Sequence, residues 1–156
     1  MQKVLKIGLI IAAVLLTLLC ANSILRSVRF LSEKQKRETI VLARLLCIRD
    51  VQYAFYEKKG YYANNFDSLI YAINKKEIIA ACAPDSLKYI PFSKQKLVEM
   101  EVGKVLLSDG TDKEAFEIKA PFFSYLADLD EEEISRLQTE SIRLKSYPGL
   151  RISSED

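Results

Sequence analysis

The side chains that most often carry catalytic chemistry are sparse in this sequence. None of its 156 residues is histidine, which removes the commonest general base and any Ser-His or Cys-His nucleophile pair. With no histidine and no CxxC motif, a structural zinc site is not expected either. No phosphate-binding loop, nucleotide fingerprint or paired-carboxylate constellation is present. We therefore expect a protein that is not an enzyme and that uses no cofactor.

One acidic group has the ligand chemistry of a calcium site. Asp109, Asp112 and Glu114 supply the carboxylate oxygens that calcium prefers, but their spacing does not match the twelve-residue calcium loop. We favour a polar hairpin turn over residues 108–112, with Gly110 supplying a positive φ, and keep the three acids as weak calcium candidates. The acidic run 128–133 is interpreted as the start of a helix, where the dipole favours negative charge.

Cysteine and tyrosine are the remaining reactive or ligand-contacting side chains. Of the three cysteines, Cys20 falls in an apolar run, so at most one disulfide, Cys47–Cys82, is expected. Cys47 lies on the apolar face of a predicted helix, which favours a small buried hydrophobe over a nucleophile. Five tyrosines could line a ligand groove, but helix-to-sheet packing explains them better: Tyr53, Tyr56, Tyr61, Tyr62 and Tyr71.

The element that organises the chain is a single helix predicted over residues 4–58. Its first part, Val4 to Ala21, is apolar except for Lys6, and its second part, Asn22 to Lys58, is charged and amphipathic. The whole stretch contains no proline and one glycine, Gly8, so nothing obliges the helix to stop.

The apolar run has three interpretations. As a membrane anchor over residues 1–25 it approaches the twenty or so residues that span a bilayer. As a cleavable signal peptide it would end near Ala21-Asn22-Ser23. As a lipoprotein signal it would use Cys20, although Leu19 is bulkier than the usual preceding residue. We favour the anchor and expect the run to stay attached in the mature protein.

A basic cluster follows the apolar run, in a polar juxtamembrane helix over residues 26–38. Its members are Arg26, Arg29, Lys34, Lys36 and Arg37. This cluster has two interpretations. It could bind anionic lipid headgroups, or it could be a solvent-exposed part of the long helix, which we slightly favour. The bias of positive charge favours a cytoplasmic main domain, whereas the short N-terminal tail before a signal-like run favours export. The net charge of +2 gives no global field that would attract nucleic acid.

Residues 39–156 are predicted to form a globular α+β domain. Val41, Leu45, Ile48 and Phe55 share one helix face with Val51, and a stripe of this width faces a core. The helix should end at Gly60. A short helix capped by Asn65 or Asp67 should then run to about residue 74.

Past Pro84 the apolar period changes to two, which predicts a small antiparallel sheet with one solvated face. The expected strands are Leu87–Phe92, Lys96–Val102, Val105–Ser108, Glu114–Ala120 and a short final strand within residues 147–152. Between the last two strands, Asp128 or Asp130 should cap a helix that runs to Leu144.

With these elements in order, the chain resembles type IV pilins and the pseudopilins of type II secretion. The resemblance is carried by Ala43 to Ile73, ARLLCIRDVQYAFYEKKGYYANNFDSLIYAI, with its helix-ending Gly60-Tyr61-Tyr62 and the capped Phe66-Asp67-Ser68-Leu69. It implies a long helix that is half anchor and half spine, packed on an antiparallel sheet. Ala13 stands five residues after Gly8, where pilin precursors carry a glutamate. The chain also resembles small uncharacterised envelope proteins of Bacteroidota that end in a similar YPGL segment (Tyr147 to Leu150).

Three functions follow as hypotheses. The first is a single-pass inner-membrane protein with a periplasmic pilin-like domain, which joins other membrane-anchored subunits or copies of itself in an envelope assembly. The second is a cytoplasm-facing tether or regulator whose basic segment binds anionic lipid. The third, a secreted ligand binder released by signal cleavage, is weighted least.

Overall fold

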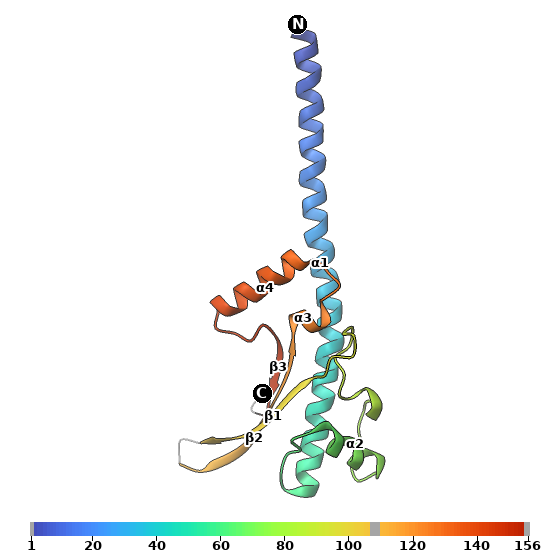
Figure 1. Cartoon of the computed structure of the whole chain (residues 1–156), viewed down its shortest axis with the longest axis vertical. Coiled ribbons are helices and arrows are strands. Elements are labelled where there is room, and N and C mark those ends of the chain that lie inside the picture. Colours follow the sequence, from blue (N-terminus) through green and yellow to red (C-terminus); the bar gives the residue numbers. More distant parts are fainter. Residues whose placement is uncertain (1, 107–109, 155–156) are drawn as a thin grey trace. The chain divides into compact units, whose positions relative to one another are not determined.

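The computed structural model describes residues 2–106 and 110–154, with side chains from residue 6 onward. Two compact units divide the chain, residues 1–35 and residues 36–156. The globular unit thus begins three residues before the boundary expected at residue 39. The fold is α+β, as the sequence predicts (Figure 1).

One uninterrupted helix, α1 (Gln2–Lys59), contributes to both units, which confirms the single helix predicted over residues 4–58. Two lysines, Lys58 and Lys59, occupy its last turn, where positive charge complements the helix dipole. Gly60 follows with φ +80°, and its N–H donates to the carbonyl of Tyr56 at 2.8 Å. This left-handed residue ends the helix as expected.

Within the globular unit, α1 buries a stripe of apolar side chains. Val41, Leu45 and Ile48 are fully buried, and Phe55 is 4% exposed. Gln52 is also fully buried on this part of the helix. Its side-chain amide donates to the Ala63 carbonyl at 2.7 Å and accepts from the Ala63 N–H at 2.9 Å. Because both halves of the amide are bonded, this buried polar group fixes the chain after α1 at little cost.

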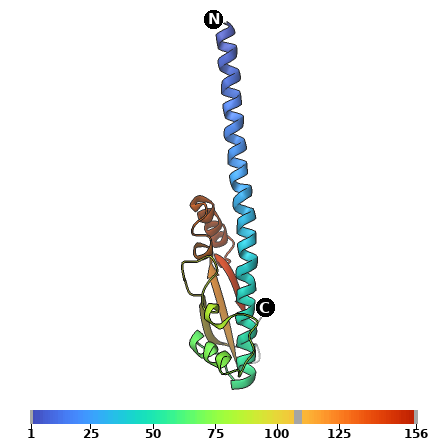
Figure 2. The ribbon, with the colours of Figure 1, turned by 90° about the vertical axis from the view of Figure 1, so that its right-hand side faces the viewer.

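Helix α2 (Phe66–Asn74) is capped at its N-terminus by Asn65 and not by Asp67. The Asn65 side chain accepts the N–H of Ser68 at 2.8 Å, and Asp67 adds negative charge to the first turn. In Figures 1 and 2, α2 lies beside the last turns of α1.

The sheet has three antiparallel strands in the order β1-β2-β3: β1 (Glu99–Leu106), β2 (Asp112–Pro121) and β3 (Gly149–Ser153). Leu106 pairs with Asp112, so β1 and β2 form the predicted hairpin. Outward-facing charges pair along and across the strands: Lys119 contacts Glu101 of β1 at 2.8 Å and Glu117 of its own strand at 2.6 Å, and Arg151 of β3 contacts Glu117 at 3.2 Å. In the described part of the chain β1 pairs with β2 alone, which leaves it as an edge strand.

Two strand predictions are wrong. Leu87–Phe92 forms no strand and contributes one isolated bridge, from Tyr89 to Leu97. It follows a 3-10 turn, η1 (Pro84–Ser86), and its last residue, Phe92, has φ +62°, which breaks an extended ladder. Lys96–Val102 and Val105–Ser108 were expected as separate strands, but β1 runs through Gly103 without a break as far as Leu106.

The C-terminal part adds two helices before β3. The short α3 (Phe122–Tyr125) leads to α4 (Glu131–Arg143), which is capped by Asp130 through the N–H groups of Glu132 and Glu133. β3 starts at Gly149, where an added Cβ would lie 2.3 Å from the carbonyl oxygen of Ala120. Glycine is therefore required where β3 meets β2.

Helix α1 runs alongside the sheet (Figure 2), and aromatic rings make contacts between them. The Tyr53 ring meets the Phe116 ring of β2 edge to face, with centroids 5.5 Å apart. The Tyr53 hydroxyl donates to the carbonyl of Ser154 at 3.0 Å. Tyr62 adds a second contact with Phe116 at 4.8 Å. The packing role expected for the tyrosines is thus confirmed for Tyr53 and Tyr62.

Candidate functional site

The N-terminal apolar segment is the feature of unit 1 with the clearest physical consequence. From Ile7 to Leu25 its large apolar side chains are between 51 and 69% exposed. One helix in the described part of the chain, Lys6–Lys59, is long and apolar enough to cross a membrane. Exposed apolar area of this extent is unfavourable in water, so this segment requires an apolar environment.

The basic residues after the apolar segment do not act as one group. Arg26, Arg29 and Lys36 are exposed, whereas Lys34 is half-buried. Arg37 differs, since it is 8% exposed and belongs to the globular unit. A buried and paired guanidinium is not presented to lipid, so Arg37 does not belong among the residues that could bind lipid headgroups.

Arg37 is the centre of a polar junction between α1 and α3. Its guanidinium donates to the Tyr125 carbonyl at 2.9 Å and makes two bonds to the Asp128 carboxylate, one of them at 2.9 Å. The same group lies 5.0 Å from the centroid of the Phe92 ring. A planar guanidinium suits such a forked contact better than an ammonium would. The junction ties the first turn of the unit to a residue 91 positions away.

The electrostatics of this junction follow from the pairing. Hydrogen bonding to Arg37 holds the pKa of the Asp128 carboxyl below its ordinary value. Next to it, burial raises the pKa of the Tyr125 hydroxyl, and Glu38 raises it further. The Tyr125 hydroxyl donates to the Glu38 carboxylate at 3.4 Å. Both groups keep their ordinary charge at neutral pH, which is typical of a structural junction and not of an acid-base centre.

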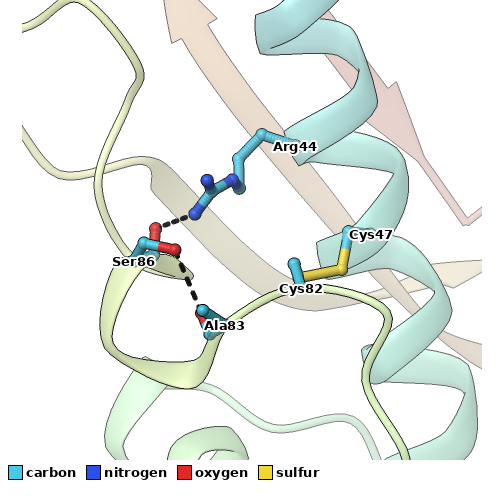
Figure 3. The surroundings of a disulfide bond; sticks show 5 residues. All are labelled: Arg44, Cys47, Cys82, Ala83 and Ser86. Carbon is cyan, nitrogen blue, oxygen red and sulfur yellow. Dashed lines mark hydrogen bonds between the residues drawn. A yellow bond between two sulfur atoms is a disulfide. The ribbon is translucent and has the colours of Figure 1, made fainter.

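A disulfide joins Cys47 of α1 to Cys82 (Figure 3). This confirms the one disulfide that the sequence permits, and it shows that Cys47 is buried as half of a cystine and not as a free thiol. The Arg44 guanidinium donates to the Ser86 carbonyl beside it, and the Ser86 hydroxyl donates to the Ala83 carbonyl at 3.1 Å. These contacts hold the segment after α2 against α1, and the bond requires an oxidising environment to persist.

The calcium candidates are only partly brought together. Asp109 lies outside the described residues, while Asp112 and Glu114 both lie on β2. The Glu114 carboxylate accepts the N–H of Tyr62 at 3.4 Å. No group of three or more histidine, cysteine or acidic side chains suited to a metal gathers in the part of the chain that the structure describes.

Comparison with known proteins adds no relative: no protein-family model, characterised protein or solved structure matches the chain. The exposed apolar segment, the disulfide and the Arg37 junction are thus the observations on which a proposed function has to rest. The sequence pointed to the first two through hydropathy and cysteine count. The junction was missed, because nothing near Arg37 in the sequence indicates that its partner is Asp128.

Proposed function

We propose that this protein is a non-enzymatic, single-pass inner-membrane protein whose domain lies in the periplasm and serves as a subunit of an envelope assembly. The Cys47–Cys82 disulfide is the observation that supports a periplasmic location of the domain, since disulfides persist in exported domains and are rare in the cytosol. The exposed apolar segment of α1 supports the anchor. The pilin-like order of a long helix followed by an antiparallel sheet supports the assembly role.

The assembly role has a physical basis in residues 22–38. Four large apolar side chains in this polar stretch are at least half exposed: Ile24, Leu25, Val28 and Leu31. Isolated helices gain little stability in water and depend on packing of an apolar face. Neighbouring helices of other subunits or of further copies would supply that packing.

A reporter fused to the C-terminus tests the orientation. We expect alkaline phosphatase to be active and a cytoplasmic fluorescent reporter to be dark. In the same cells, Cys47 and Cys82 should resist alkylation until the protein is reduced. The reverse reporter pattern, with both thiols free, would support the cytoplasm-facing tether, which the positive charge after the anchor favours.

The assembly is tested by crosslinking single cysteines in membranes. In a Cys20→Ser background, Val28→Cys should form a dimer crosslink or a crosslink to a second protein under mild oxidation. Lys75→Cys, on the exposed surface of the globular unit, is the matched control and should remain monomeric. A Val28→Cys protein that crosslinks to nothing would end the assembly proposal and leave the anchor intact.

The fate of the N-terminus is tested by mass spectrometry of the membrane-extracted protein. We expect a peptide that contains Lys3 or Lys6, because the anchor stays attached. An N-terminus at Leu9 would instead indicate prepilin processing, and one at Ile24 would indicate a secreted form.

A further inference from the structure

A hollow at the end of α1 combines exposed aromatic rings with carboxylates. It has a volume of about 380 Å³ and lies between the last turn of α1, the following loop, α2 and the turn after α2. Figures 1 and 2 show these segments together at one end of the globular unit. Pockets that bind small molecules typically range from about 300 to 1,000 Å³.

Local backbone geometry places the groups around this hollow. Gly60, at φ +80°, turns the chain so that Tyr61 packs against Phe55, with ring centroids 5.7 Å apart. After α2, Lys76 has φ +57° and the Glu77 N–H donates to the Ala72 carbonyl at 3.0 Å. This turn brings the Glu77 carboxylate within 2.9 Å of the Lys59 ammonium.

The hollow has an apolar floor and amphipathic walls. Phe55 and Ala72 are buried beneath it, at 4 and 2% exposed. Tyr61 and Tyr71 stand beside it at 52 and 61% exposed, so the packing role expected for all five tyrosines does not extend to these two. Tyrosine at this exposure offers a flat apolar ring and a hydroxyl in one side chain.

The polar groups narrow the class of ligand. Asp67 and Glu77 supply two carboxylates, Lys59 supplies an ammonium, and Lys58 and Lys75 lie close enough to act on Glu77. Charges of both signs are therefore nearly balanced around the hollow, which favours a neutral ligand over a strongly charged one. The Lys59–Glu77 contact, which raises the pKa of Lys59 and lowers that of Glu77, keeps the rim charged and disfavours an acyl chain. A ligand with a flat apolar face and several hydroxyl donors satisfies both the rings and the carboxylates.

We propose that this hollow binds a neutral saccharide. The C–H face of a sugar ring lies against the ring of Tyr71, the more exposed of the two tyrosines. Its hydroxyl groups donate to the carboxylates of Asp67 and Glu77 and accept from the Lys59 ammonium. The inference goes beyond the proposed assembly role, since every residue in it belongs to the globular unit and none belongs to the anchor.

The test uses full-length protein in a zwitterionic, sugar-free detergent, because glycoside detergents would compete. Isothermal titration with chitotetraose and with maltotetraose should give saturable binding of at least one of them. Tyr71→Ala should weaken that binding at least about ten-fold and Asp67→Asn about five-fold, as expected for lost ring contact and for a lost hydrogen bond to a charged group. Tyr71→Phe should stay within about three-fold of wild type, since the ring remains.

Phe123→Ala is the matched control, because Phe123 is an aromatic residue 46% exposed outside the hollow. It should bind as wild type does, and all variants should keep the wild-type melting temperature to within a few degrees. Absence of saturable binding to both sugars would overturn the proposal. Equal weakening by Tyr71→Ala and Phe123→Ala would also overturn it. Neither result bears on the crosslinking or topology experiments, so the saccharide site and the assembly role fail separately.

Discussion

The two halves of α1 have the same backbone and opposite surroundings. Before residue 26, large apolar side chains are exposed on all sides of the helix. After residue 40, apolar side chains at spacings of three and four form one stripe that is almost completely buried. Helix geometry is therefore set locally, while the spacing of apolar residues determines whether the helix requires an apolar solvent or a protein core. Mutations in the first half should consequently affect membrane retention, and mutations in the second half should affect the stability of the globular unit.

The largest effect is expected from a charge placed in the buried stripe. Ile48→Asp should lower the free energy of unfolding of the globular unit by at least about 3 kcal/mol, because an unpaired buried carboxylate is left without a partner. Leu16→Asp, in the exposed apolar segment, should leave the melting transition unchanged and reduce membrane retention. Thermal unfolding and carbonate extraction separate the two. An unchanged melting point for Ile48→Asp would contradict the burial of this side chain in the core of the globular unit.

Removing the disulfide should have the next largest effect. The Cys47→Ser, Cys82→Ser double variant loses a constraint across a sequence separation of 35, which should cost about 2–4 kcal/mol in chemical denaturation. Cys20→Ser, the control in the apolar segment, should change nothing in the same measurement. If reduction leaves the denaturation midpoint where it was, the bond contributes little to stability.

The Arg37 junction should have a smaller, pH-dependent effect. Because the pKa of Asp128 is lowered in the folded state, its pairing stabilises the fold above the ordinary carboxyl pKa of about 4. That contribution is lost as the pH falls through the lowered folded value. The Asp128 side chain is 61% exposed, so Asp128→Asn should cost about 1 kcal/mol or less at pH 7.

Measuring the melting temperature as a function of pH tests this contribution of the Arg37–Asp128 pair to stability. The Asp128→Asn variant and the wild type should converge as the pH falls below the lowered folded-state pKa of Asp128, since the carboxyl is then protonated in both states of the wild type. A gap that stays constant from pH 7 to pH 3 would contradict the ionic origin of the effect.

Elements defined by local signals could be predicted from the sequence. The sequence predicts the end of α1 before Gly60 and narrows the caps of α2 and α4 to two residues each, of which the structure uses Asn65 and Asp130. All three boundaries depend on residues within one turn. The β1–β2 hairpin likewise follows from alternation and a glycine-containing turn. Each of these signals acts over a few residues, so these elements could be predicted from a single sequence.

Features that depend on distant residues could not be predicted. Alternation over residues 87–92 indicated a strand, yet buried Leu87 and Ile90 belong to an irregular segment that includes Pro91 and ends at the left-handed Phe92. Arg37 looked like one member of a charge run until the fold brought Asp128 to it. The sequence allowed a ligand groove lined by tyrosines but favoured packing, because Asp67 of α2 and Glu77 of the following turn are brought beside Tyr71 only by the fold.

The open edge of the sheet has a consequence for proteins crowded into two dimensions. Copies held in one membrane by the proposed anchor would meet far more often than copies free in solution. The outer edge of a strand such as β1 could then join copies into a continuous, irreversible sheet. Three of the eight residues of β1 are charged: Glu99, Glu101 and Lys104. Desolvating these charges against another strand is costly, so they act as gatekeepers against aggregation. In the proposed assembly, these charges would let copies reach a high surface density while contact through their helices stays reversible.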